Sequence, residues 1–392
     1  MRAADSGNSR IGGGACGRWI GRLFGLVFAV MLVLICPVCA EDAVFGEAYS
    51  SFLEQIPEDV AALLPDGVFS EDVAEVGEAA AEMSGFRFLL ARVSELLLLE
   101  LDGVLRLFGR LLSVLVIAAV TGTVKKSIGS DALARAVELC GGCAVIGTLL
   151  SLTGEAVTVV SGFFERLSVL VNGIIPLTGV LYAMGGNVGT ATVSAGGMMI
   201  FLNVVENLCA ATLAPVVGIC VAIAVADVFF GGNLRGLGNF VKKVYTYFLG
   251  TVMLLLTFSL SVQTSLAAGA DGVAMKSAKM LAGRAIPVVG GAVGDTLRTV
   301  AGSVAYLKSA TGTVGIVAVA LLVIPPLLSV ILWRLGLIAA SAAADLLGCA
   351  AEGKLLEAFV TVYGYLLAVM SIAAVTAIFL LTLFVKCSVA LA

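Results

Sequence analysis

The sequence predicts an all-α membrane protein with about six to eight transmembrane helices, some of them re-entrant or broken. A cleaved signal peptide and a short acidic helical segment precede them. Two observations carry this prediction. Of the 392 residues, 60% are hydrophobic and only 13% are charged, whereas soluble domains are about 25% charged. The mean hydropathy of +1.10 is too high for a chain that must stay dissolved.

The sequence contains no histidine. This excludes Ser-His-Asp and Cys-His nucleophiles, zinc sites with imidazole ligands and histidine proton relays. The glycine-rich part of the chain, 269–308, contains neither a Walker A loop nor a dinucleotide fingerprint. We therefore expect no enzymatic activity and no cofactor.

Residues 1–40 have the pattern of a secretory signal peptide. Four arginines precede an apolar run, Leu23–Cys36, which is short for a membrane span. Pro37 then breaks the helix, and small residues end at Ala40. We expect cleavage between Ala40 and Glu41. The alternative is an uncleaved anchor helix from Ile20 to Ala40.

Residues 41–103 form an acidic and then amphipathic segment. From Glu41 to Phe86 there are twelve acidic residues and no lysine or arginine, which suits the extracytoplasmic side. Apolar residues at helical spacing, punctuated by Pro57 and Pro65, predict short amphipathic helices joined by turns. This part is either a docking surface for partners or a solvated linker. The charged, leucine-rich run that follows predicts an interfacial helix.

Residues 104–392 form the polytopic membrane domain. The first span is expected at Leu107–Val124, and the basic residues after it, Lys125, Lys126 and Arg135, indicate a cytoplasmic loop. Further apolar stretches are Ala136–Leu152, Leu167–Met184, Met198–Phe230, Val244–Ala267, Gly312–Trp333, Leu335–Leu347 and Phe359–Val385.

The number of crossings affects where the next basic loop lies. If every apolar stretch crosses once, Arg235, Lys242 and Lys243 fall outside the cell, against the positive-inside rule. A re-entrant Leu167–Met184, which contains Pro176, removes this conflict.

A weak internal repeat relates 173–267 to 284–385. Ala226-Asp227 recurs as Ala344-Asp345, and Val244-Tyr245-Thr-Tyr247 recurs as Val362-Tyr363-Gly-Tyr365, both at an offset of 118 residues. Paired, interrupted segments are typical of transporter-like cores. The alternative is convergent packing of small residues between helices.

Polar groups inside the apolar stretches are few, and Glu206, Asp227 and Asp345 are the candidate pathway residues. A carboxylate at the centre of a span costs about 2.5–3.5 kcal/mol on insertion scales, so it should face a partner or water. Glu206, the most deeply placed, either lines a lumen or couples protons, or else pairs internally or packs as a neutral acid. Cys140 and Cys143 have redox-motif spacing but begin an apolar helix, where packing between helices is the simpler interpretation.

The segment 269–308 differs in character from the spans. Asp271 and Gly272 begin an amphipathic stretch whose lysines, Lys276 and Lys279, share one face. Pro287, Gly290 and Asp295 belong to the glycine-rich stretch that follows. The segment is either a connector at the membrane surface or a re-entrant element that lines a pore.

The run from Asp271 to Lys279, followed by Ile286-Pro287-Val-Val-Gly290 and Asp295-Thr296, resembles the stage III sporulation protein AE family. The resemblance covers essentially the whole mature chain. It implies a multi-pass protein of the mother-cell membrane facing the forespore.

Its implied partners are other products of the stage III A operon, namely an ATPase (AA), membrane proteins (AB, AC, AD and AF) and ring proteins (AG and AH). Stage II sporulation protein Q is an indirect partner. Membrane lipid is the remaining expected partner, and no nucleic acid is expected. The family supplies no catalytic residues.

Three functions follow for testing. The leading one is a non-enzymatic component of a channel or secretion complex that links mother cell and forespore and is required after engulfment. The second is an ion-coupled secondary transporter in which Glu206 or Asp227 couples ions to substrate. The third is a purely structural membrane scaffold.

Overall fold

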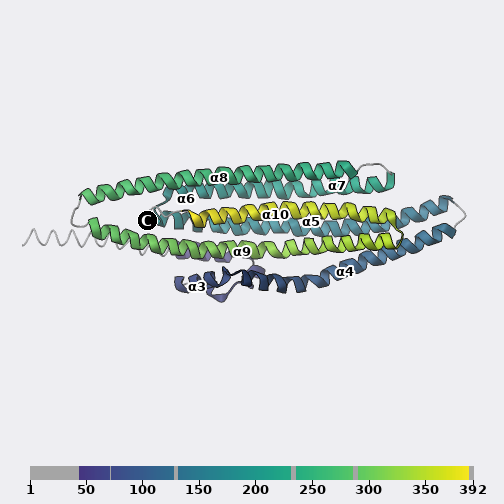
Figure 1. Ribbon diagram of the computed structural model, residues 1–392, viewed down its shortest axis with the longest axis horizontal. Helices are drawn as coiled ribbons and strands as arrows, with labels where there is room; N and C mark the ends of the chain where they lie inside the picture. Colours follow the sequence, from purple (N-terminus) through teal and green to yellow (C-terminus); the bar gives the residue numbers. More distant parts are fainter. Residues whose placement is uncertain (1–43, 71, 128–130, 231–234, 286–289, 388–392) are drawn as a thin grey trace, which may run out of the picture.

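The computed structural model describes residues 44–70, 72–127, 131–230, 235–285 and 290–387 (Figure 1). The signal peptide and its cleavage site, Ala40 and Glu41, lie outside the described residues. All elements of the described chain are helical, and six of its helical stretches are long and apolar enough to cross a membrane. The predicted fold class is therefore confirmed.

The bounds of the elements follow the chain order. Residues 44–54 are helical and are followed by short helices: α2 (Glu58–Ala61), the 3₁₀ helix η1 (Asp66–Phe69) and α3 (Val73–Met83). The long elements are α4 (Phe86–Ser127), α5 (Asp131–Met184), α6 (Val188–Asn203), the π-helix η2 (Val204–Ala210), α7 (Ala211–Phe230), α8 (Arg235–Ala285), α9 (Gly290–Leu346) and α10 (Ala350–Lys386).

The acidic segment 44–83 is a folded part of the bundle. The Tyr49 hydroxyl donates to the carbonyl of Val68 at 2.7 Å, and Phe52 and Met83 are fully buried. This burial raises the pKa of the Tyr49 hydroxyl far above its ordinary value. The Asp72 side chain caps α3 by accepting from a backbone N–H. The segment packs on α9 and is therefore no loose linker.

Two apolar stretches that the sequence treats separately are parts of longer helices. Leu167–Met184 is not re-entrant, because it continues Ala136–Leu152 within α5 and passes Pro176 without a break. Leu335–Leu347 is likewise the end of α9 rather than a separate stretch. A proline removes only one backbone hydrogen bond, and packing against neighbouring helices tolerates that loss.

The continuity of α5 also resolves the position of the second basic loop. Because α5 is one continuous helix, the end of α4, the start of α5, the end of α7 and the start of α8 lie at the same end of the bundle (Figure 1). Lys125 and Arg235 therefore belong to the same end, in line with the positive-inside rule, while Lys276, Lys279 and Lys308 lie toward the other end. The re-entrant segment that the sequence suggested is not needed for this agreement.

The two short turns have the same construction. The turn between α5 and α6 places Gly186 at φ 76°, and the turn between α9 and α10 places Gly348 at φ 77°. The N–H groups of Asn187 and Cys349 each bond the carbonyl five residues back, at 2.8 and 2.9 Å. A residue with a Cβ is strained at this left-handed position, so glycine sets both turns.

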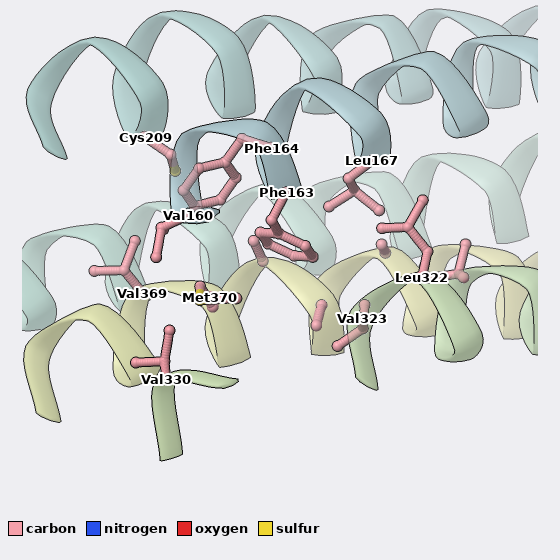
Figure 2. Packing of buried hydrophobic residues seen from close by; sticks show 14 of the residues in the cluster. Val160, Phe163, Phe164, Leu167, Cys209, Leu322, Val323, Val330, Val369 and Met370 are labelled. Carbon is pink, nitrogen blue, oxygen red and sulfur yellow. The ribbon is translucent and has the colours of Figure 1, made fainter. Parts of the chain in front are cut away.

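The long helices form layers that run along one axis (Figure 1). On one side α8 lies beside α6 and α7, and α5 and α10 fill the middle. On the other side α9 packs against α3 and α4, and α4 also contacts α5. The core lies where α5, α9 and α10 meet. There Phe163 and Phe164 of α5 face Leu322 of α9 and Met370 of α10 (Figure 2).

Three adjacent helices contain apolar stretches without any charged residue, which we call the charge-free zone: 244–270 in α8, 309–333 in α9 and 358–385 in α10. Each measures roughly 40 Å along its helix axis, which is enough to cross a hydrocarbon core of about 30 Å.

At each end of the charge-free zone, the limits of stretches from different helices lie side by side. At one end the ring of Tyr365 contacts Tyr245 at 5.8 Å, and Trp333 contacts Tyr363 at 6.5 Å. At the other end the Lys308 ammonium lies over the ring of Phe384 at 5.3 Å. Aromatic side chains and lysines are typical of membrane–water interfaces. The three stretches are therefore the parts of α8, α9 and α10 that best fit the bilayer.

The offset of 118 residues relates helices that run in the same direction. Adding the offset to the residue numbers of α6 and α7 leads into α9, and adding it to those of α8 leads into α10. Asp227 and Asp345 then occupy matching positions, near the ends of α7 and α9. The π-helix η2 contains 207–208, and the same offset leads to Pro325 and Pro326. The offset thus pairs a π-helical turn with a proline pair inside a continuous helix, and the repeat stays a prediction.

Candidate functional site: polar residues in the apolar helices

Glu206 lies on the outer surface of the bundle. It belongs to the π-helix η2, and it and its neighbours Asn203 and Asn207 are all exposed. The Asn207 side-chain amide donates to the carbonyl group of the Asn203 side chain at 3.1 Å. Among the described residues, none forms a hydrogen bond or ion pair with the Glu206 carboxylate. The alternative of an internal pair with lysine or arginine is therefore not met within the described chain.

The depth of Glu206 is fixed by contacts on either side. Tyr245, at the aromatic end of the charge-free zone, contacts the Thr212 hydroxyl and donates to the Leu208 carbonyl at 3.2 Å. Glu206 lies six residues before Thr212, so it is roughly 9 Å inside the zone. It is the one charged residue between Val188 and Ala226.

The inner side of η2 is apolar. Cys209 is completely buried and points toward Phe164 of α5 (Figure 2). A π-helix adds one residue to the turn and thereby rotates the helix face that follows, and such turns occur often at functional sites. Here the extra residue keeps Cys209 in the core while the polar side chains of the same turn point outward.

Asp227 lies where α7, α8 and α10 meet. Together with Lys242 and Lys354 it lines a small cavity of about 40 Å³. A cavity of this size holds about one water molecule and no organic substrate. The sequence predicted Asp227 as a candidate but did not connect it with the two lysines: Lys242 comes from the next helix, α8, and Lys354 from the distant α10.

Asp345 lies at the end of α9, and its side chain is exposed. Its backbone carbonyl accepts the Gly348 N–H at 3.1 Å, and a Cβ added at Gly353 would lie 2.9 Å from its carboxylate oxygen. The structure therefore places Asp345 at a turn, away from Glu206 and inside no cavity that the described residues form.

Asp271 joins two helices. Its carboxylate accepts the backbone N–H of Gly189 at 3.1 Å, the N–H of Thr190 at 2.8 Å and the Thr190 hydroxyl at 2.8 Å. It therefore caps the first turn of α6 from α8, where the predicted cap was for its own helix. We call these three bonds the Asp271 clasp.

The other motif residues are spread along the same end of the bundle. Gly272 and Lys279 are partly exposed, and Lys276 is exposed. Pro287 lies outside the described residues, Gly290 begins α9, and Asp295 lies in the first turns of α9. Residues 269–285 are a continuous part of α8, so over these residues the chain forms no re-entrant element.

Lys308 is a buried charge that the sequence analysis did not single out. It is 3% exposed, its ammonium lies 4.7 Å from the ring centroid of Tyr182, and it donates to the Cys387 carbonyl. It thereby binds the last carbonyl groups of α10, where a cation is favoured. The sequence signal that could have identified Lys308 is a single lysine between two apolar runs.

Cys140 and Cys143 are both exposed near the start of a candidate span. Within the described residues, no three histidine, cysteine, aspartate or glutamate side chains are grouped as metal ligands. The structure thus brings the two thiols near no third ligand in the described chain, and their exposure gives no support to a packing role.

Comparison with known proteins identifies one family. The model of the stage III sporulation protein AE family matches residues 72–390, which is most of the chain. Comparisons with curated proteins and with solved structures give no significant match. The matched range includes the membrane helices, Glu206 and the Asp271 clasp. The chain therefore belongs to the stage III sporulation protein AE family.

Proposed function

We propose that this protein is a non-enzymatic membrane component of a channel or secretion complex that links mother cell and forespore. The observation that carries the proposal is its membership of the stage III sporulation protein AE family over residues 72–390. Six helices long and apolar enough to cross a membrane support a multi-pass role in that complex.

We place the protein in the mother-cell membrane facing the forespore. Its partners are the ATPase AA, the membrane proteins AB, AC, AD and AF, and the ring proteins AG and AH, with stage II sporulation protein Q as an indirect partner. The acidic segment 44–83 supports this placement, because it contains no lysine or arginine and packs along α9, away from the end of the bundle that holds Lys125 and Arg235 (Figure 1). It then faces the space between the two membranes, where it can dock partners.

Gene deletion and complementation test the proposal. In a spore-forming host, deleting the gene should leave engulfment intact and abolish late forespore transcription, measured with a forespore reporter, and the wild-type gene should restore it. A deletion strain with normal late forespore transcription contradicts the proposal.

The transporter alternative makes a different prediction. Ion-coupled uptake by the purified protein alone in vesicles, lost in Glu206→Gln or Asp227→Asn, would establish it in place of the conduit. A scaffold requires neither transport nor these carboxylates. If the protein is a scaffold, both variants should complement the deletion. Transport between the two cells, measured directly, should then be the same with and without the protein.

A further inference from the structure

We propose that the outward patch of Asn203, Glu206 and Asn207 on η2 is the contact between two copies of this chain. The copies lie side by side in one membrane, related by an axis along the membrane normal. In this pair the Asn203 amide of each copy donates to the Glu206 carboxylate of the other. The inference goes beyond the proposed conduit and does not depend on it.

The patch is incomplete in a single chain. Glu206 is exposed inside the charge-free zone, and no described residue pairs with it. In lipid, an unpaired carboxylate at this depth is strongly unfavourable, so such residues face another protein surface or water. The nearest polar side chains on the same face are Asn203 and Asn207. The Asn207 amide donates to the backbone carbonyl of Asn203 at 3.2 Å and to its side-chain carbonyl at 3.1 Å, which leaves the amide hydrogens of Asn203 for a further acceptor.

The patch is complementary to itself. It combines a carboxylate, which only accepts hydrogen bonds, with two carboxamides that donate them. Residues three and four apart lie on one face of a helix, within about one turn of each other. When two copies are related by an axis along the membrane normal, equal depths meet, so Glu206 of one copy reaches the asparagines of the other.

The helix after the patch permits close approach of the second copy. Ala211, Ala214, Gly218 and Ala222 are exposed on α7 at intervals of three and four residues. A groove of about 590 Å³ lies between α7 and α5, with Gly154 of α5 in its lining. Small residues at such spacing let helix backbones pack closely in membranes, where polar groups add hydrogen bonds between helices.

The opposite face of the bundle has the character of a lipid-facing surface. The groove between α8 and α10 measures about 810 Å³, and Leu254, Phe258, Val375 and Phe379 in its lining are large, apolar and exposed. This face needs no hydrogen-bonding partner. The two faces therefore differ in character, because the α8–α10 groove is lined mainly by apolar side chains whereas the η2 face carries an exposed carboxylate.

Energy transfer between labelled copies tests the proposal. The full chain, fused at its C-terminus to donor or acceptor fluorescent proteins, is co-expressed, and transfer is measured in membrane vesicles over a range of expression levels. We expect saturable transfer for the wild type and at least about tenfold weaker association for Glu206→Leu, because the variant loses its hydrogen bonds between helices. Glu206→Gln keeps an acceptor and adds a donor, so it should retain association.

The matched control is Gln263→Leu, which replaces an exposed polar side chain of the charge-free zone on α8. It should leave association unchanged, whereas Gly218→Leu should weaken it by blocking close approach. Circular dichroism and thermal stability confirm that each variant is folded. Absence of saturable transfer in the wild type overturns the proposal. Unchanged association in Glu206→Leu, or an equal loss in Gln263→Leu, also overturns it.

Discussion

The Asp271 clasp should contribute measurably to the stability of the bundle. Asp271→Ala removes three hydrogen bonds, all to a charged acceptor and all between 2.8 and 3.1 Å long. Loss of a helix cap costs about 0.5–2 kcal/mol, and hydrogen bonds to charged groups contribute about 1.5–3 kcal/mol each. Because water replaces part of these bonds, we expect a total loss of about 2–4 kcal/mol. Asp271→Asn, which keeps one acceptor oxygen, should lose about half as much.

The assay is thermal unfolding of the purified chain in nanodiscs. A loss of 2–4 kcal/mol lowers the melting temperature by about 4–8 °C, at about 2 °C per kcal/mol for a chain of this size. Lys276→Ala is the matched control, since this lysine is exposed on the same helix, and it should change stability by less than about 0.5 kcal/mol.

The neighbouring glycine gives an independent check on the clasp. A Cβ added at Gly189 would lie 2.8 Å from the Asp271 carboxylate oxygen. Gly189→Ala should therefore displace the carboxylate and destabilise the wild type more than it destabilises Asp271→Ala. If Asp271→Ala is no more destabilising than Lys276→Ala, or if the two effects at Gly189 and Asp271 simply add, the reasoning is refuted.

Three further predictions concern other contacts. Gly77→Ala should destabilise the acidic segment by about 1–3 kcal/mol, because the added Cβ collides with the Tyr306 hydroxyl. Limited proteolysis measures this loss, and adding Tyr306→Phe to the variant should restore part of its resistance to the protease. Lys308→Met should lower the melting temperature by loss of about 1–3 kcal/mol, since it removes a cation from two ring faces and a donor from a helix end; an unchanged melting temperature would contradict this role. Arg166→Ala should cost less than about 1 kcal/mol in denaturant unfolding, because Arg166 and Asp59 pair at 2.6 Å while about half exposed; a larger loss would show that the pair is shielded from water.

The sequence predicts the fold class well because composition alone requires a membrane protein of helices. It also predicts the short helices of the acidic segment, because proline acts locally at Pro57 and Pro65. These features depend on backbone conformation within a few residues, which a local pattern records.

Helix ends inside the apolar region are much harder to predict. Pro176 and the pair Pro325–Pro326 suggest breaks, yet α5 and α9 continue through them. Whether a proline interrupts a helix depends on what packs around it, and neighbours from distant parts of the chain decide that. Charges such as Arg334 do not end a helix either, because a helix can continue out of the bilayer.

The candidate site was predicted only in part, for the same reason. Glu206 was singled out correctly as a lone carboxylate in an apolar helix, but its outward direction follows from the π-helix, which no local pattern indicates. Asp271 was expected to cap its own helix, whereas it caps α6. Lys242, Lys354 and Lys308 gain their surroundings from helices that the linear sequence does not bring together.

The lengths of α8 and α9 have a mechanical consequence. Beyond Asp271 and before Lys308, both helices extend past the charge-free zone by roughly 25 Å. Each projecting segment is a continuous helix of several turns, so it is stiffer than a flexible linker and holds its two ends at a set distance. A protein bound at the far end of this projection is held at a fixed stand-off from the lipid surface. The bundle thus acts as a spacer whose length is determined by the number of helical turns.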